Sequence, residues 1–134
     1  MLAEARIVAP SRVARLLIVE DELLIAWSLR ESLSAAGHEV VSIASTADEA
    51  VAMAEDGEPD LIVMDINLGR GGDGVDAGAR IRGRRAVPIL FVTAYRDDRT
   101  LARVAENVPD APVLAKPLLP GELERAVKKA LAAI

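Results

Sequence analysis

The sequence has 134 residues, enough for a single domain, and its hydrophobic content of 51% supports a sizeable core, although only Trp27, Phe91 and Tyr95 are aromatic. Because it contains no cysteine, disulfides, thiol catalysis and cysteine metal sites are excluded, and a reducing cytoplasm is favoured. The net charge of −5, with no long basic stretch and no apolar run near the roughly 20 residues of a membrane span, predicts no direct contact with nucleic acid or membrane.

Residues 1–14 are predicted to form a short N-terminal arm, and residues 15–134 a single domain in which short apolar runs alternate with amphipathic segments. The predicted strands are 15–19, 38–44, 60–64, 87–92 and 111–115. The predicted helices are 21–37, ended by Gly37; a helix from the Ser45–Thr46 capping box to about residue 56; 75–83; 96–107; and 120–134, with Pro120 near its first position. The basic cluster at 80–85 is interpreted as a solvated helix end.

Five strand–helix units in alternation predict an α/β fold in which a parallel sheet carries helices on both faces. In such a sheet, ligands bind at the carboxyl ends of the strands. The polar residues that follow the predicted strands are Glu20, Asp21 and Glu22; Asp65 and Asn67; Thr93 and Tyr95; and Lys116 with Pro117. Several carboxylates, a hydroxyl and an ammonium should therefore meet at one edge, where a hard cation such as Mg²⁺ would neutralise the acids.

Each of these residues taken alone also has an ordinary structural explanation. Asp21 fits a helix N-cap, and Lys116 with Pro117 fits a turn. Asp73 beside Gly74 is interpreted as a helix cap, and His38 as a partly exposed structural residue. The specific signal is the whole set in its order along the chain.

The segments LLIVEDE, DLIVMDINL, PILFVTAY and VLAKPL resemble those of response-regulator receiver domains of bacterial two-component signalling. The resemblance covers about residues 15–133 and implies a flavodoxin-like (βα)5 sheet with strand order 2-1-3-4-5. It implies Asp65 as the phosphoryl acceptor, with Thr93 and Lys116 bonding the phosphoryl group. It also implies that Mg²⁺ is held by Glu20, Asp21, Asp65 and the backbone carbonyl of Asn67, and that the Lys116–Pro117 bond is cis.

The resemblance further implies that the phosphoryl group comes from a histidine kinase or a histidine phosphotransfer protein. The chain would assist only its own phosphorylation and dephosphorylation, and so would not be an enzyme in the usual sense. The surface expected to switch is formed by residues 96–107, 111–115 and 120–132, in a monomer or a phosphorylation-dependent dimer. Because the given sequence stops soon after the last predicted helix, the output is expected to pass through a downstream protein or a phosphoryl relay.

Three features depart from the common pattern of the resembled family. The loop after Asp65 is rich in glycine and one residue longer, which predicts higher mobility. Val113 stands where an aromatic residue often couples to Thr93, so that coupling cannot operate in its usual form. Tyr95 lies beside the acceptor and is interpreted either as an exposed loop residue or as a modulator that shields the acyl phosphate or replaces the switch.

Three other interpretations compete with a stand-alone receiver. The chain could be a receiver fragment of a longer transcription factor or hybrid kinase. A haloacid-dehalogenase-type phosphatase also uses a strand-terminal Asp, Mg²⁺, Thr and Lys, but it needs a second Asp where this sequence has Asn67, whose side chain is no general acid, and the chain lacks the length of a cap domain. The intact acidic, Thr and Lys set argues against a receiver that has lost phosphorylation.

Overall fold

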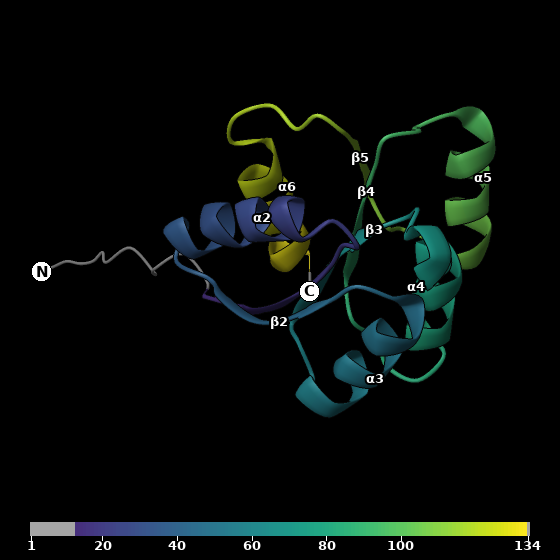
Figure 1. The fold of residues 1–134 in the computed structure, drawn as a ribbon, viewed down its shortest axis with the longest axis horizontal. Helices are drawn as coiled ribbons and strands as arrows, with labels where there is room; N and C mark the ends of the chain where they lie inside the picture. The colour runs from purple at the N-terminus through teal and green to yellow at the C-terminus, as the bar shows by residue number, and fades with distance from the viewer. Residues whose placement is uncertain (1–12, 134) are drawn as a thin grey trace, which may run out of the picture.

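A computed structural model describes residues 13–133, and in this range five strands alternate with five α-helices (Figure 1). Residues 1–12 of the predicted N-terminal arm lie outside the described residues. The last residue of that arm, Ala14, is fully buried. Its N–H donates to His38 Nδ1 at 3.1 Å, and its carbonyl accepts from the Glu39 N–H at 2.9 Å. His38 therefore has a structural bond, as predicted, and its partial burial lowers its pKa.

The five strands form one parallel sheet in the order β2-β1-β3-β4-β5, which confirms the predicted flavodoxin-like order. They are β1 (Arg15–Val19), β2 (Glu39–Ala44), β3 (Leu61–Asp65), β4 (Ile89–Thr93) and β5 (Val113–Ala115). Asp65 is paired with Val92 and Thr93 with Ala115, so the strands end at nearly the same level. This register brings the polar residues after the strands to one edge.

Two strands begin two residues later than predicted. β4 starts at Ile89 and β5 at Val113, in each case directly after a proline. Pro88 and Pro112 have no N–H to give to the ladder, although their carbonyls accept from Ile62 N at 3.0 Å and Phe91 N at 2.9 Å. Proline therefore sets the first residue of each strand.

The helices are α2 (Leu23–Ala35), α3 (Ala47–Gly57), α4 (Gly74–Arg82), α5 (Asp98–Asn107) and α6 (Glu122–Ala132). Thr46, Asp73 and Asp97 cap α3, α4 and α5 by accepting hydrogen bonds from backbone N–H groups. Asp21 is not a cap, because the N-cap of α2 is Glu22 and makes no side-chain cap bond. Pro120 also lies further from α6 than predicted, since the N-cap of that helix is Gly121 in a left-handed conformation.

Helices cover both faces of the sheet (Figure 1). Helices α2 and α6 pack on one face through Ala26, Leu29, Leu33, Leu123, Val127 and Leu131. Helices α3, α4 and α5 pack on the other through residues that include Ala50, Ala54, Val75, Ile81 and Val104. Because both faces are covered, the residues of β3 and β4 are buried throughout.

The solvent side of α2 carries large apolar side chains. Leu23, Leu24 and Trp27 are exposed, with Trp27 45% and Leu24 78% exposed, whereas Ala26, Leu29 and Leu33 are buried. Leu119, in the loop before α6, is also exposed. Among the described residues, no helix combines the length and the apolar character that crossing a membrane requires.

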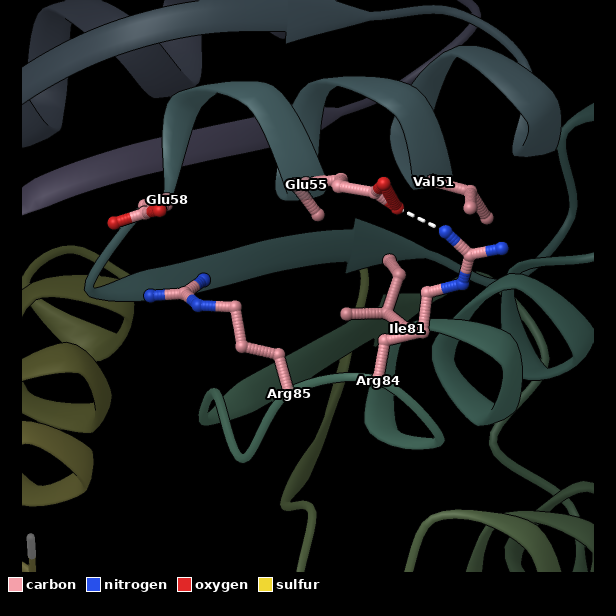
Figure 2. A pocket seen from close by; sticks show the side chains of 7 residues that line it. Val51, Glu55, Glu58, Ile81, Arg84 and Arg85 are labelled. Carbon is pink, nitrogen blue, oxygen red and sulfur yellow. Dashed lines mark hydrogen bonds and ion pairs between the residues drawn. The ribbon is translucent and has the colours of Figure 1, made fainter.

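Arg80 and Arg82 lie in the last turn of α4, and Arg84 and Arg85 follow it. All four bind neighbouring backbone or acidic groups, so they do more than face solvent. They make Arg80–Asp48 and Arg84–Glu55 ion pairs, and bonds from Arg82 to the Val87 carbonyl and from Arg85 to the Pro59 carbonyl. Figure 2 shows Arg84, Arg85, Glu55 and Ile81 around a pocket of about 470 Å³ between α3 and α4. No residue from the carboxyl ends of the strands lines this pocket.

Candidate functional site

Three charged side chains from three strand ends meet in the structure. Asp65 is the last residue of β3, Glu20 follows β1, and Lys116 follows β5. Lys116 Nζ donates to Glu20 Oε1 at 2.8 Å and to Asp65 Oδ2 at 3.2 Å. Glu20 and Asp65 are buried, whereas Lys116 is partly exposed. The sequence prediction that these residues converge is therefore reproduced by the geometry.

Glu20, Asp21 and Asp65 form an acidic cluster whose carboxylate oxygens lie within 4.8 Å of one another. Asp21 is exposed and lines a cavity of about 310 Å³ together with Asp65, Asn67, Tyr95 and Lys116. A set of hard oxygen donors, some buried and some open to water, suits Mg²⁺, which keeps several water ligands. The donor chemistry thus fits the metal that the sequence implied.

Burial and mutual repulsion perturb the charges of this cluster. Removal from water, and then the nearby Glu20 carboxylate, raise the pKa of Asp65 to about 6, although Lys116 acts in the opposite direction. Partial burial lowers the pKa of Lys116, but its bonds to Glu20 and Asp65 raise it more, so the net shift is upward. Lys116 is therefore held as a cation between two carboxylates.

Thr93 and Asn67 flank the acceptor. Thr93 ends β4, is buried, and accepts a hydrogen bond at Oγ1 from the Tyr95 N–H at 3.1 Å. The Asn67 N–H donates to Asp65 Oδ1 at 3.3 Å, and its side-chain oxygen accepts from the Gly69 N–H at 2.9 Å. The Asn67 side-chain oxygen is thus bonded within its own loop. The backbone carbonyl of Asn67 remains the atom predicted to bind Mg²⁺.

The remaining predicted residues lie around the rim or behind the site. Tyr95 lines the cavity and is 66% exposed. Val113 is half-buried in β5 and packs against the core on the side of α3, α4 and α5, while its carbonyl accepts from Arg96 Nε at 3.1 Å. The Lys116–Pro117 bond is cis.

Two contacts made by the segment after Asp65 were not predicted from the sequence. Gly74 sits so close to the acceptor strand that an added Cβ would lie 2.1 Å from the Asp65 carbonyl oxygen. Arg103 on α5 forms an ion pair with Asp73 at 2.8 Å. The pattern Asp73–Gly74 correctly indicates a cap, but nothing in the sequence marks the second contact of Asp73 or the closeness of Gly74.

Comparison with known proteins places these features in a wider group. A family model described as the response regulator receiver domain matches residues 16–128. PdtaR, a transcriptional regulatory protein of Mycobacterium tuberculosis, is 38% identical over 117 residues, which cover 87% of this chain and 56% of PdtaR. The phyllosphere-induced regulator PhyR of Methylorubrum extorquens is 36% identical over 127 residues, which cover 94% of this chain and 46% of PhyR.

Solved structures agree with this grouping. The signal receiver domain of a modulated diguanylate cyclase from Desulfovibrio desulfuricans matches with a TM-score of 0.81 and 34% identity, covering 91% of this chain and 96% of that one. The chain spans about half the length of the two curated relatives described above. Those relatives therefore contain sequence beyond the part that corresponds to this chain.

Proposed function

The chain belongs to the family of response regulator receiver domains, and we propose that it accepts a phosphoryl group on Asp65 from a phosphohistidine. In this reaction an Asp65 oxygen bonds to phosphorus while the bond from phosphorus to the donor's histidine nitrogen breaks. The bonding electron pair returns to the imidazole ring, which takes up a proton. The family match gives no support to the alternative of a haloacid-dehalogenase-type phosphatase.

The roles of the surrounding residues follow from their charge and position. Such a transfer spreads negative charge over the phosphoryl oxygens, so catalysis consists mostly of positioning and cationic stabilisation. Lys116, already 3.2 Å from Asp65, would pair with one of those oxygens, and the Thr93 hydroxyl would donate to another. The chain would thus assist its own phosphorylation without acting on a separate substrate.

Glu20, Asp21, Asp65 and the Asn67 carbonyl would hold Mg²⁺. When bound, the ion supplies positive charge that stabilises the phosphoryl oxygens. The contribution of Glu20, Asp21 and Asp65 is to present one carboxylate oxygen each, within 4.8 Å of one another, before the ion arrives. This preformed acidic cluster beside Lys116 is the observation that carries the proposal.

The test is a mass measurement after incubation with acetyl phosphate and Mg²⁺. Wild-type protein should gain one phosphoryl group, and Asp65→Ala should gain none. Asp98→Ala removes an exposed carboxylate from the first turn of α5 and serves as the matched control, which should be labelled like the wild type. Labelling of Asp65→Ala to the wild-type level, or loss of labelling in the control, would contradict the assignment.

We propose a histidine kinase or phosphotransfer protein in the cytoplasm as the donor. The exposed Leu23, Leu24, Trp27 and Leu119 support a protein donor, because apolar side chains on this scale are typical of protein contact surfaces. Faster labelling by a purified phosphohistidine protein than by acetyl phosphate would support this donor, and equal rates would contradict it.

The proposed output surface is formed by α5, β5 and α6. Phosphorylation would shift its population of states toward the form that a downstream protein binds, in a monomer or a phosphorylation-dependent dimer. Several relatives are transcriptional regulatory proteins. Any activity of a longer protein that contains this chain is likewise only proposed. Binding of a downstream protein equally well to labelled and unlabelled chain would contradict the proposed switch.

We further propose that Tyr95 slows attack of water on the phosphorylated Asp65, because the tyrosine lines the same cavity. Tyr95→Ala should shorten the phosphoryl half-life about threefold by admitting water to the acyl phosphate. Tyr95→Phe keeps the ring and should keep the wild-type half-life. The measurement is decay of the phosphorylated mass after donor removal, and equal lifetimes in all three proteins would refute the shielding role.

A further inference from the structure

Residues 66–74, here called the acceptor loop, run from Asp65 to the first residue of α4 and contain four glycines. Such a composition disfavours a single conformation, because glycine has a large backbone entropy to lose. The loop is nevertheless folded back on itself. Asn67 forms an isolated antiparallel bridge with Asp73, and the Gly74 N–H donates to the Ile66 carbonyl at 2.7 Å. The position of Asn67 is therefore tied to that of Asp73.

Asp73 uses its two carboxylate oxygens for two different tasks. Oδ1 accepts from the N–H groups of Val75 at 2.7 Å and Asp76 at 3.2 Å, which caps α4. Oδ2 accepts from Arg103 Nη2 on α5 at 2.8 Å, with both side chains 42% exposed. In the part of the chain that the structure describes, the Asp73–Arg103 pair is the one ion pair that joins the acceptor loop to another element.

The other side of the acceptor loop reaches the acidic cluster. A Cβ built on Gly69 would lie 3.2 Å from Asp21 Oδ2, so the backbone of the loop runs beside that carboxylate. The acceptor loop therefore contacts Asp21, adjoins Asp65 and carries Asn67. It is also bound by Arg103 through an ion pair.

We propose that Arg103 is a positioning residue that holds the acceptor loop in its Mg²⁺-binding form and links occupancy of the site to α5. The inference rests on the proposed function, since it concerns Mg²⁺ at the same site. The link between Mg²⁺ binding and the ion pair follows from thermodynamic reciprocity. If the ion pair favours the loop conformation that binds Mg²⁺, then bound Mg²⁺ must favour the ion pair by the same factor. Arg103 lies on α5, so this coupling reaches the proposed output surface.

The test is a Mg²⁺ titration of ¹⁵N-labelled protein followed through the amide signals of the acceptor-loop glycines and of α5. Arg103→Gln should weaken Mg²⁺ affinity about threefold to fivefold, the change in equilibrium constant that an exposed ion pair can support. Asp73→Asn should do the same, because an asparagine oxygen still caps α4 while the charge is lost. Arg80→Gln breaks the comparable Arg80–Asp48 pair outside the loop and should leave the affinity unchanged.

The double variant separates positioning from general stability. Arg103→Gln combined with Asp73→Asn should bind Mg²⁺ no more weakly than either single variant, because both remove one interaction. The Mg²⁺-induced shifts of Arg103–Asn107 amides should also shrink in Arg103→Gln, while those of the loop remain. Wild-type affinity in Arg103→Gln, or additive losses in the double variant, would overturn the inference. Failure of the wild type to bind Mg²⁺ or accept a phosphoryl group would instead overturn the proposed function.

Discussion

Replacing Lys116 with methionine should slow phosphorylation of Asp65 by acetyl phosphate about 10²- to 10³-fold, the cost of removing one preorganised charge-stabilising group. The same change should destabilise the metal-free protein by about 2–3 kcal/mol at pH 7.5, because Glu20 and Asp65 would be left buried without their shared cation. Rates are measured by intact mass and stability by urea unfolding in EDTA. Lys128→Met, at an exposed position of α6, is the control and should match the wild type in both.

The stability loss should depend on pH in a defined direction. The pKa of Asp65 is raised from its ordinary 3.8 to about 6 in the folded protein, so the folded state binds more protons than the unfolded state between these values. Stability from this group is therefore greater at low pH and is lost as pH rises through about 6. Because Lys116 lowers this pKa, its removal should deepen the loss at pH 7.5 and shrink the difference from wild type at pH 5. An equal difference at both pH values would mean that charge is not the cause.

Gly74→Ala should destabilise the protein by about 3 kcal/mol or more, as expected when a side-chain atom is forced into a packed backbone. The added Cβ would lie 2.1 Å from the Asp65 carbonyl oxygen and 2.9 Å from Ile66 Cα. Neither atom belongs to a flexible side chain that could move aside. The end of β3 would have to shift, and the Asp65 carboxylate would shift with it, so labelling by acetyl phosphate should also fall.

Gly57→Ala is the matched control for this experiment. Gly57 is the last residue of α3, and a Cβ there meets nothing within 4 Å. The change should be neutral or stabilise by up to about 0.5–1 kcal/mol, because alanine has the higher helix propensity. The measurement is thermal and urea unfolding of both variants. Similar midpoints for Gly74→Ala and Gly57→Ala would show that β3 relaxes more easily than the contact implies.

The convergence of Glu20, Asp65 and Lys116 could be predicted from the sequence because a parallel sheet imposes it. Each residue directly follows or ends an apolar run, and aligned strands leave such positions at one edge. The fold could be predicted from the alternation of apolar, strand-like runs with amphipathic, helix-like segments. Prolines account for the late starts of β4 and β5. The order of these residues along the chain, combined with the geometry of a parallel sheet, was therefore enough to predict this part of the site.

Features that depend on the exact path of a loop, or on which face of a helix is covered, could not be predicted from the sequence. Arg103 lies 30 residues from Asp73, and among 16 basic and 21 acidic residues no spacing rule selects this pair. The apolar spacing in residues 21–37 also did not show that Leu23 and Trp27 face solvent while Ala26 and Leu33 are buried. Helical periodicity defines a stripe, but the tilt of the helix on the sheet decides which edge of that stripe is covered.

The half-exposed position of Trp27 on α2 has a practical consequence for spectroscopy. As the sole indole in the sequence, it should dominate ultraviolet emission, and it reports on the solvent side of α2 rather than on the aliphatic interior. Emission wavelength is therefore an insensitive gauge of unfolding in this chain. It is instead an intrinsic, dye-free probe of any macromolecule that settles over the beginning of α2.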